Sequence, residues 1–307
     1  MVNKLKLLFI TKDFTKRLEK STVYLIEELT KITDLRIWYD HGSIISILEQ
    51  LNFQPDYILL NDYKSDYCPF IFDLNKINIP IGAIMHDLKY KPFRRAQFYE
   101  RENIRTIFTI YRDAAQQLYP QFQDRFVWLP HHVPTNIFRD YQLEKNIDVL
   151  MMGALYRHMY PMRAKFYEIL KNHPGFTYHS HPGYEVIEDF SNVYAGEKYA
   201  REINRAKIFV TCDSVDRFPV MKYYEATACR SLLLATPSKE LADLGFIDGE
   251  TFVAINEENV LNKIHFYLQN ESERLKIAKK GYEMVRSRHS TEIRAQQLVA
   301  EIIKRIN

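Results

Sequence analysis

The sequence lacks the features that would make it a membrane or disulfide-rich protein. It contains no apolar run near the roughly 18 residues needed to span a bilayer, and its N-terminus has no signal-peptide core. Its three cysteines, Cys68, Cys212 and Cys229, show no C-x-x-C or Cys/His ligand spacing. We therefore predict a cytoplasmic protein with reduced thiols and no zinc site.

The chain also lacks an excess of charge of one sign. It has 42 basic and 39 acidic residues, a net charge of +3 that is too even to indicate a specific nucleic-acid partner. Hydrophobic residues make up 46% of the 307 positions, which is typical of globular proteins. This length is sufficient for two domains with separate cores.

Short apolar runs are frequent in the first 130 residues, and helical or loop segments separate them. Runs of this length read as strands buried on both faces of a parallel sheet. They predict one Rossmann-like domain. The runs cover residues 5–10, 35–38, 57–60, 81–85, 106–110 and 126–129.

The pattern begins again after residues 129–138, which contain two prolines and no periodicity. We therefore predict two doubly wound α/β domains that face each other across a cleft. The expected domains are residues 1–140 and 141–288, and residues 289–307 form a C-terminal helix that could pack back on the first domain. The second set of strands is expected at residues 147–152, 176–179, 208–212, 232–235 and 251–255.

Ligands of open α/β sheets bind at the carboxyl ends of the strands, so the residues that follow each run are candidates. In the first domain these include Lys12, Asn61, Asp62 and the pair His86-Asp87. An imidazole beside a carboxylate can act in acid/base chemistry, so His86 and Asp87 are the predicted catalytic residues. The alternative is a histidine that only ends its strand.

Residues 89–105 are rich in basic and aromatic side chains. Such a stretch could bind an anionic acceptor or a membrane surface. Lys12, Arg94 and Arg95 are the predicted acceptor-binding residues. The alternative is a solvated helix face with a buried aromatic side.

Residues 218–237 predict a helix that starts near Pro219 and leads into a buried strand. Lys222 and Glu225 are three apart and share one face of that helix. A phosphate could bind Lys222 and the free N–H groups of the helix end, while Glu225 accepts from sugar hydroxyls. The alternative is a surface ion pair.

A glycine and two arginines follow the first strand of the second domain. Gly153 ends the strand, Arg157 lies in the next loop and Arg163 in the next helix. No G-x-G-x-x-G or Walker A motif is present. Arginine can nonetheless bond two oxygens of a diphosphate at once.

Several motifs of the second half together resemble those of GT-B glycosyltransferases, in particular the CgeB-like group and the larger glycosyl transferases group 1. The proline-bearing segment 129–138 resembles the interdomain linker of that group. The matching motifs are residues 148–153, 160–163, 206–210, 222–229 and 289–294.

The resemblance implies a donor site for a nucleoside-diphosphate sugar, with UDP-sugar favoured. Glu225 would bind the ribose, and His86 would lie near the transferred sugar. Two positions depart from the group 1 pattern: Arg217 replaces an acid eight residues before Glu225, and Lys222 replaces an arginine. The implied donor-binding residues are Gly153, Arg157, Arg163, His181, Lys222, Tyr223 and Glu225.

The predicted function is therefore sugar transfer to an unidentified acceptor, with retention of anomeric configuration. No Asp-x-Asp pair follows a strand, so we expect neither an essential metal nor a cofactor. Two alternatives share the fold: a nucleotide-sugar epimerase or hydrolase, and a nucleotide-binding scaffold without catalysis. Turnover distinguishes the scaffold from both enzymes.

Overall fold

The computed structural model describes residues 4–183, 187 and 189–306, and their contacts divide the chain into two compact units. Unit 1 contains Met1–Thr15, Thr22–Pro130 and Glu292–Asn307. Unit 2 contains Lys16–Ser21 and His131–Thr291. The division after residue 130 falls within the proline-bearing segment.

Unit 1 is built on a parallel six-stranded sheet with the order β2-β1-β4-β6-β7-β8. The chain reverses its direction of travel across the sheet between β1 and β4, and ligands of such sheets bind where this reversal occurs. Two short strands, β3 and β5, form a separate pair. The strands are β1 (Lys6–Ile10), β2 (Asp34–Trp38), β3 (Gly42–Ser43), β4 (Tyr57–Leu60), β5 (Ile71–Phe72), β6 (Ile81–Met85), β7 (Thr106–Thr109) and β8 (Phe126–Trp128).

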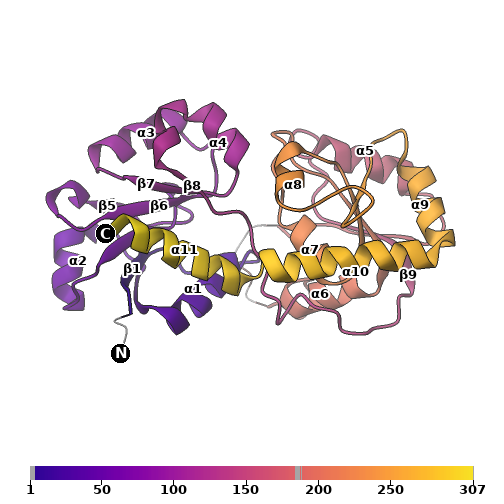
Figure 1. Cartoon of the computed structure of the whole chain (residues 1–307), viewed down its shortest axis with the longest axis horizontal. Helices are drawn as coiled ribbons and strands as arrows, with labels where there is room; N and C mark the ends of the chain where they lie inside the picture. Colours follow the sequence, from indigo (N-terminus) through magenta and orange to yellow (C-terminus); the bar gives the residue numbers. More distant parts are fainter. Residues whose placement is uncertain (1–3, 184–186, 188, 307) are drawn as a thin grey trace. The chain divides into compact units, whose positions relative to one another are not determined.

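Helices cover both faces of this sheet (Figure 1). On one face, Leu25 and Leu29 of α1 share a core with Ala295, Leu298 and Ile302 of α11. The last helix of the chain therefore completes the core of unit 1. The helices are α1 (Ser21–Ile32), α2 (Ile44–Leu51), α3 (Pro92–Arg101), α4 (Arg112–Leu118), α11 (Thr291–Ile306) and the 3-10 turns η1 (Leu74–Lys76) and η2 (Pro120–Arg125).

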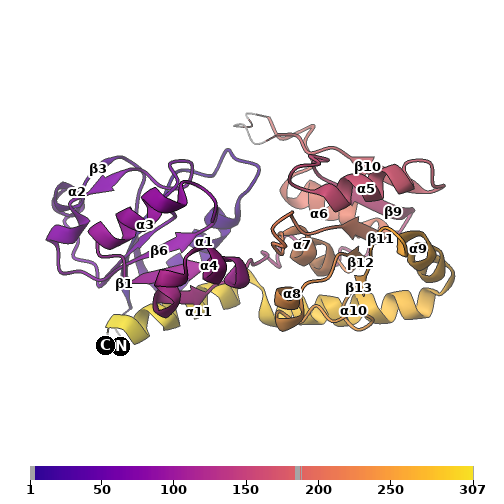
Figure 2. The same ribbon diagram turned by 90° about the horizontal axis from the view of Figure 1, so that it is seen from above.

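Unit 2 has a parallel five-stranded sheet with the order β10-β9-β11-β12-β13, and its strands follow one another in this order in Figure 2. The reversal lies between β9 and β11, so the loops after these two strands are where a ligand is expected. The strands are β9 (Ile147–Met152), β10 (Phe176–His179), β11 (Ala206–Thr211), β12 (Leu232–Ala235) and β13 (Val253–Ala254).

The core on one face of the second sheet includes Phe166 and Leu170 of α5 together with Val260 and Ile264 of α9. Helices α6 and α7 lie toward the other face (Figure 1), and α10 also contributes Ile277 and Ala278 to the first core. The helices are α5 (Pro161–Leu170), α6 (Gly196–Asn204), α7 (Lys222–Ala228), α8 (Lys239–Asp243), α9 (Val260–Gln269) and α10 (Glu271–Arg288).

One predicted helix begins later than expected. Helix α7 starts at Lys222, whereas the sequence predicted a start near Pro219. The Tyr223 N–H donates to the Val220 carbonyl at 3.1 Å, a tighter i to i−3 bond that places Pro219 in the loop before the helix. Helix α7 therefore has only seven residues. For binding an anion at its start, the charge of nearby side chains matters more than the dipole of so short a helix.

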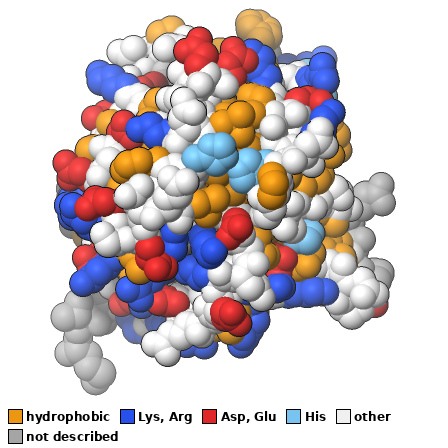
Figure 3. Space-filling view, turned by 90° about the vertical axis from the view of Figure 1, so that its right-hand side faces the viewer, with side chains coloured by type: hydrophobic (Ala, Val, Ile, Leu, Met, Phe, Trp, Pro, Cys, Tyr) orange, Lys and Arg blue, Asp and Glu red, His pale blue; other side chains and the backbone are white. Residues whose placement is uncertain are grey.

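The surface in Figure 3 shows basic and acidic side chains interleaved with apolar ones. No helix among residues 4–183, 187 and 189–306 is long and apolar enough to cross a membrane.

Candidate active site

Two basic side chains of unit 2 converge on Gly153 at the end of β9. Gly153 has a φ of +126°, and a Cβ atom there would lie 2.8 Å from Lys222 Cε and 3.3 Å from Arg163 Nη1. A side chain at this position would displace both cations, and the backbone conformation itself favours glycine. The absence of a side chain at Gly153 thus leaves room for the two cations at the sheet edge.

Arg163 is buried, and none of the described acidic residues is its partner. Its guanidinium donates from Nη1 to the Ala154 carbonyl at 3.1 Å and from Nη2 to Thr211 Oγ1 at 3.4 Å, and it lies 4.1 Å from the Tyr160 ring. Its Nε is buried with no hydrogen-bond partner, and no ion pair involves Arg163 within the described part of the chain. Burying a cation in this way is costly, and a bound anion would offset the cost.

The pKa values of two neighbouring groups are lowered first by burial and then by the positive charge nearby. Burial lowers the pKa of Lys222 to about 8; Arg163 adds to this effect and Glu225 opposes it. Burial, then Lys222 and then Arg163 lower the pKa of His181 to about 4. His181 is therefore neutral near pH 7, and Lys222 carries its charge there without an ion-pair partner among the described residues.

Glu225 lies in the interior and does not form the surface ion pair with Lys222 that the sequence left open. Its side chain is 9% exposed, and Oε2 accepts a hydrogen bond from the Tyr199 hydroxyl at 3.2 Å. Burial raises its pKa, and Lys222 opposes this shift. A buried carboxyl beside a tyrosine and a lysine can accept hydrogen bonds from the hydroxyls of a ligand.

The two other predicted donor-site residues lie in different surroundings. Arg157 is exposed in the loop after β9. Tyr223 is fully buried, and its hydroxyl donates to the Thr236 carbonyl at 2.7 Å. Tyr223 therefore anchors α7 to the end of β12, whereas Arg157 is free to reach a ligand.

In unit 1, His86 follows β6 in a fixed orientation. Asn61 donates through Nδ2 to Thr11 Oγ1 at 2.9 Å and to Thr22 Oγ1 at 3.1 Å, so its Oδ1 faces His86 Nε2 at 2.8 Å. The proton therefore resides on Nε2, and Nδ1 keeps its lone pair. The Tyr67 ring stacks on the imidazole with centroids 4.5 Å apart.

Burial lowers the pKa of His86 to about 4, with Arg95 contributing and Asp62 and Asp87 opposing. The imidazole is neutral at physiological pH and can accept a hydrogen bond at Nδ1. The neighbouring Asp87 is paired with Lys64 at 3.1 Å rather than with His86.

Arg95 lies in the interior of unit 1. Both Arg95 and Asp62 have fully buried side chains, and Arg95 Nη2 donates to Asp62 Oδ1 at 2.7 Å. Asp62 Oδ2 accepts from the backbone N–H groups of His86 at 2.9 Å and Asp87 at 3.2 Å. Through Asp62, Arg95 thus stabilises the loop that begins at His86, and it does not face an acceptor, contrary to the interpretation from the basic stretch.

The other predicted acceptor-binding residues are at the surface of unit 1. Arg94 is exposed on α3, and Lys12 follows β1 with its Nζ 3.4 Å from His41 Nε2. The structure therefore brings Lys222, Arg163, Glu225 and His181 together, whereas Lys12 and Arg94 are separate surface cations.

Sequence reasoning did not find Tyr160 and Tyr199, which contact Arg163 and Glu225. The spacing in the sequence could have indicated the contact of Tyr160 with Arg163, because the two residues are three apart at the start of a helix and so share one face. Tyr199 lies in α6 and meets α7 only through the tertiary fold. Among the described residues, no group of three His, Cys, Asp or Glu side chains gathers as metal ligands, and the expectation of no essential metal stays a prediction.

Residues 162–300 match a family model described as glycosyl transferase-like. This part of the chain is similar to glycosyl transferases. The matched residues include Arg163, Lys222 and Glu225, so the gathered side chains lie within the part of the chain that matches. The predicted enzyme class, a glycosyltransferase, is confirmed, whereas the CgeB-like group stays a prediction. A search of curated proteins gives no match.

Solved structures show the same fold as this chain. HepE from Anabaena in complex with UDP and glucose has 11% identity and a TM-score of 0.63, covering 98% of this chain and 100% of its own. A glycosyltransferase from Rickettsia africae has 12% identity and a TM-score of 0.63, and the match covers 99% of this chain and 100% of the glycosyltransferase. Sucrose-phosphate synthase from Thermosynechococcus elongatus has 12% identity and a TM-score of 0.58, and the match covers 85% of this chain and 76% of the synthase. The predicted GT-B fold is confirmed.

Proposed function

We propose that the chain transfers a sugar from a UDP-sugar bound by unit 2 to an acceptor. The observation that carries this proposal is the convergence of Arg163 and Lys222 on Gly153, with no acidic partner for either cation among the described residues. A diphosphate would supply the missing negative charge. HepE, which shares the fold, has been solved with UDP and with UDP-glucose, and this supports uridine as the base.

Each side chain of the site has a role in the proposed reaction. Arg163 and Lys222 would bind the diphosphate oxygens, with Arg157 reaching from the exposed loop, and Glu225 would accept from the ribose hydroxyls. The acceptor oxygen forms a bond to the anomeric carbon as the bond from that carbon to the diphosphate breaks. Negative charge develops on the departing UDP, so preorganised cations lower the barrier.

We assign His86 to the acceptor side. Its imidazole is neutral and its Nδ1 lone pair is an acceptor for the proton of a hydroxyl. The stacking on Tyr67 and the bond to Asn61 fix the ring, which suits a group that positions a substrate.

Four finer features are part of the proposal. Cations at the diphosphate make the reaction independent of a metal, and the group 1 resemblance favours retention of anomeric configuration. Residues 89–105 present exposed Arg94 and Phe93, which suits an anionic acceptor or a membrane surface. The fourth feature is a cytoplasmic location.

A thermal-shift screen tests the donor. UDP, GDP, ADP and CDP, and their glucose conjugates, are added with magnesium or with EDTA. A ligand at about 100 times its dissociation constant adds roughly 2.7 kcal/mol to the stability of the folded protein. We expect the uridine nucleotides alone to raise the melting temperature, equally with EDTA. A shift with another base, or only with magnesium, would contradict the corresponding part of the proposal.

A further inference from the structure

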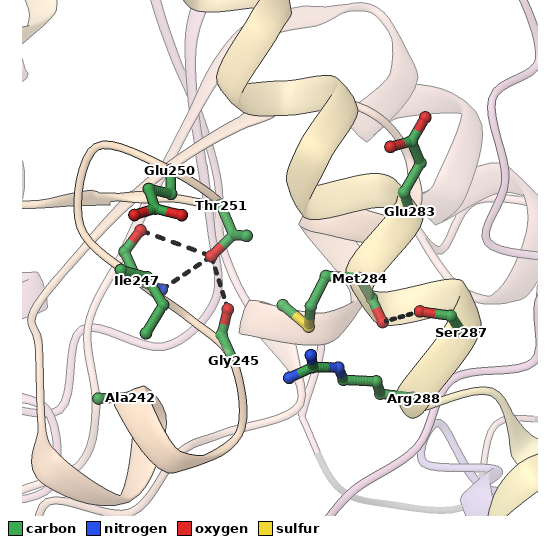
Figure 4. Close-up of a pocket in the computed structure, with 9 residues that line it drawn as sticks. All are labelled: Ala242, Gly245, Ile247, Glu250, Thr251, Glu283, Met284, Ser287 and Arg288. Carbon is green, nitrogen blue, oxygen red and sulfur yellow. Dashed lines mark hydrogen bonds between the residues drawn. The ribbon is translucent and has the colours of Figure 1, made fainter.

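A cavity of about 430 Å³ in unit 2 lies between α10 and residues 245–251 (Figure 4). Two of its hydroxyl groups already have protein partners, because Thr251 donates to the Gly245 carbonyl at 2.7 Å and Ser287 to the Met284 carbonyl at 3.1 Å. None of its described lining residues has a buried polar side-chain atom without a hydrogen-bond partner. The cavity therefore shows no group that requires a ligand, and the stronger candidate lies in unit 1.

Lys12 and His41 of unit 1 direct hydrogen-bond donors at each other. His41 Nδ1 accepts from the Phe70 N–H at 2.9 Å, so the ring proton resides on Nε2. This Nε2 lies 3.4 Å from Lys12 Nζ, and an ammonium group can only donate. The contact joins two donors, so no hydrogen bond stabilises it, and a ligand oxygen can supply the acceptor that both groups lack.

The backbone holds the imidazole of His41 in this orientation. His41 directly precedes β3, whose residue Gly42 pairs with Ile71 of β5. The Gly42 N–H donates to the Phe70 carbonyl at 3.2 Å, beside the bond from the Phe70 N–H to His41. Paired backbone on both sides therefore fixes the ring, and a fixed donor is what a binding site needs.

The position of the two donors in the sheet is that of a ligand site. Lys12 follows β1 and His41 follows β2, so both lie beyond the carboxyl ends of strands, next to the reversal between β1 and β4. Within the described part of the chain no ion pair involves Lys12, and the adjacent Asp13 accepts from the Thr15 N–H at 2.8 Å. A cation and an N–H group that converge can bind an oxyanion through charge-assisted hydrogen bonds.

The same loop positions these donors and His86. The Lys12 N–H donates to the Tyr67 carbonyl at 2.8 Å, and the Tyr67 ring stacks on His86. Phe70, which orients His41, lies in the same loop after β4. We propose that an oxyanion of the acceptor, a phosphate or a carboxylate, binds between Lys12 Nζ and His41 Nε2. Its assignment to the acceptor rests on the proposed function, whereas anion binding at this place does not.

NMR of the full chain with isotope-labelled histidine tests the site directly. The signal of His41 is identified by its absence from the spectrum of His41→Asn. Inorganic phosphate and acetate are titrated separately, and we expect the His41 signal to shift and saturate. Tighter binding of phosphate would assign a phosphate to the acceptor, and tighter binding of acetate a carboxylate. Either result supports the proposal.

Lys12→Met separates binding at this pair from a general effect of salt. It keeps the apolar stem and removes the charge, so the affinity measured at His41 should fall about tenfold. Lys31→Met, at a lysine of α1 that is 64% exposed, makes the same charge change and should leave that affinity unchanged. Unchanged signals of the other histidines verify that each variant is folded. The proposal is overturned if neither ion shifts the His41 signal, or if Lys12→Met responds as wild type does.

Titration with UDP keeps this test distinct from that of the proposed donor. UDP should shift the signal of His181, beside Lys222 in unit 2, and leave that of His41 in place. A shift of His41 by UDP that disappears in Lys12→Met would place the donor's phosphates here and overturn the assignment to the acceptor. Absence of any UDP binding would count against the proposed donor, and the response of His41 to phosphate and acetate would still decide whether the anion site exists.

Discussion

Both units have charged side chains at the carboxyl edge of a parallel sheet. In unit 1 the charge has protein partners, and in unit 2 it has none among the described residues. In unit 1, Asp62 follows β4 and its carboxylate is saturated by Arg95 and by backbone N–H groups. In unit 2, Arg163 and Lys222 meet at the end of β9 with no carboxylate bonded to either among the described residues. A satisfied buried charge fixes a loop, and an unsatisfied one is ready for a ligand.

This difference explains why the two sites should respond differently to substitution. Removing Asp62 leaves a buried guanidinium without a partner, so the cost appears as lost stability. Removing Lys222 takes away a cation whose burial is already unfavourable, so the cost appears as lost ligand affinity.

The largest effect is expected from Asp62→Ala. Breaking one partner of a buried ion pair costs roughly 3–5 kcal/mol, and the left-handed Asp62 backbone, with a φ of +97°, loses its anchors as well. Urea denaturation measures the loss. Asp66→Ala, at an aspartate that is 56% exposed, is the matched control and should cost under about 1 kcal/mol. Equal effects of the two variants would refute the structural role of Asp62.

Lys222→Ala should reduce UDP affinity by about tenfold or more, because a charge-assisted hydrogen bond to phosphate is lost. Its unfolding free energy should stay at or above that of wild type. Titration calorimetry and urea melts measure the two quantities. Lys279→Ala, at a lysine on α10 that is 63% exposed, should change neither. A Lys222→Ala protein that binds UDP normally would remove Lys222 from the donor site.

The lowered pKa of Lys222 gives a smaller, pH-dependent effect. Above about pH 8 the free protein loses this charge, so UDP affinity should decline as the pH rises from 8 to 10. Over the same range the unfolded chain, with an ordinary lysine pKa of 10.5, binds more protons than the folded one. Stability without ligand should therefore rise with pH through the contribution of Lys222. Lys222→Ala should flatten both profiles, and an unchanged slope would show that another group titrates.

The smallest effect on nucleotide binding is expected at His86. His86→Ala should leave UDP affinity unchanged while lowering the rate of sugar transfer. Equal losses of UDP affinity and of transfer rate would show that His86 does not act on the acceptor. NMR titration should place its pKa near 4, with the proton on Nε2. Its contribution to stability should fall as the pH drops from 6.5 to 4, because the unfolded histidine binds the proton first. Asn61→Asp should raise this pKa by placing a carboxylate at the same distance.

Much of the fold could be predicted because the strands are fully buried. Residues 57–60 and 232–235 are apolar at every position and form β4 and β12 as expected. The start of α7 was missed because Pro219 is compatible both with a first helical turn and with a preceding loop. The hydrogen bond from Tyr223 to Val220 that decides between them is a three-dimensional property.

The sequence predicted which residues form the candidate site, but only partly whether each of the predicted side chains is buried or exposed. Gly153, Arg163, Lys222 and Glu225 were all named from strand ends and from a family resemblance. Nothing in the sequence separated Arg94 from Arg95, although one is exposed and the other has no exposed surface. Helical neighbours differ in direction by about 100°, so packing of α3 on the sheet sends one to solvent and the other inward.

The sequence by itself determined the two parallel sheets and the strand ends that carry ligand chemistry, because buried strands need continuous apolar runs and strand ends need not. Only the tertiary structure decided which charges have partners. Asp62 and Arg95 are 33 residues apart, and Arg163 and Lys222 are brought to Gly153 from separate helices. Whether a buried charge stabilises the fold or awaits a ligand depends on those distances.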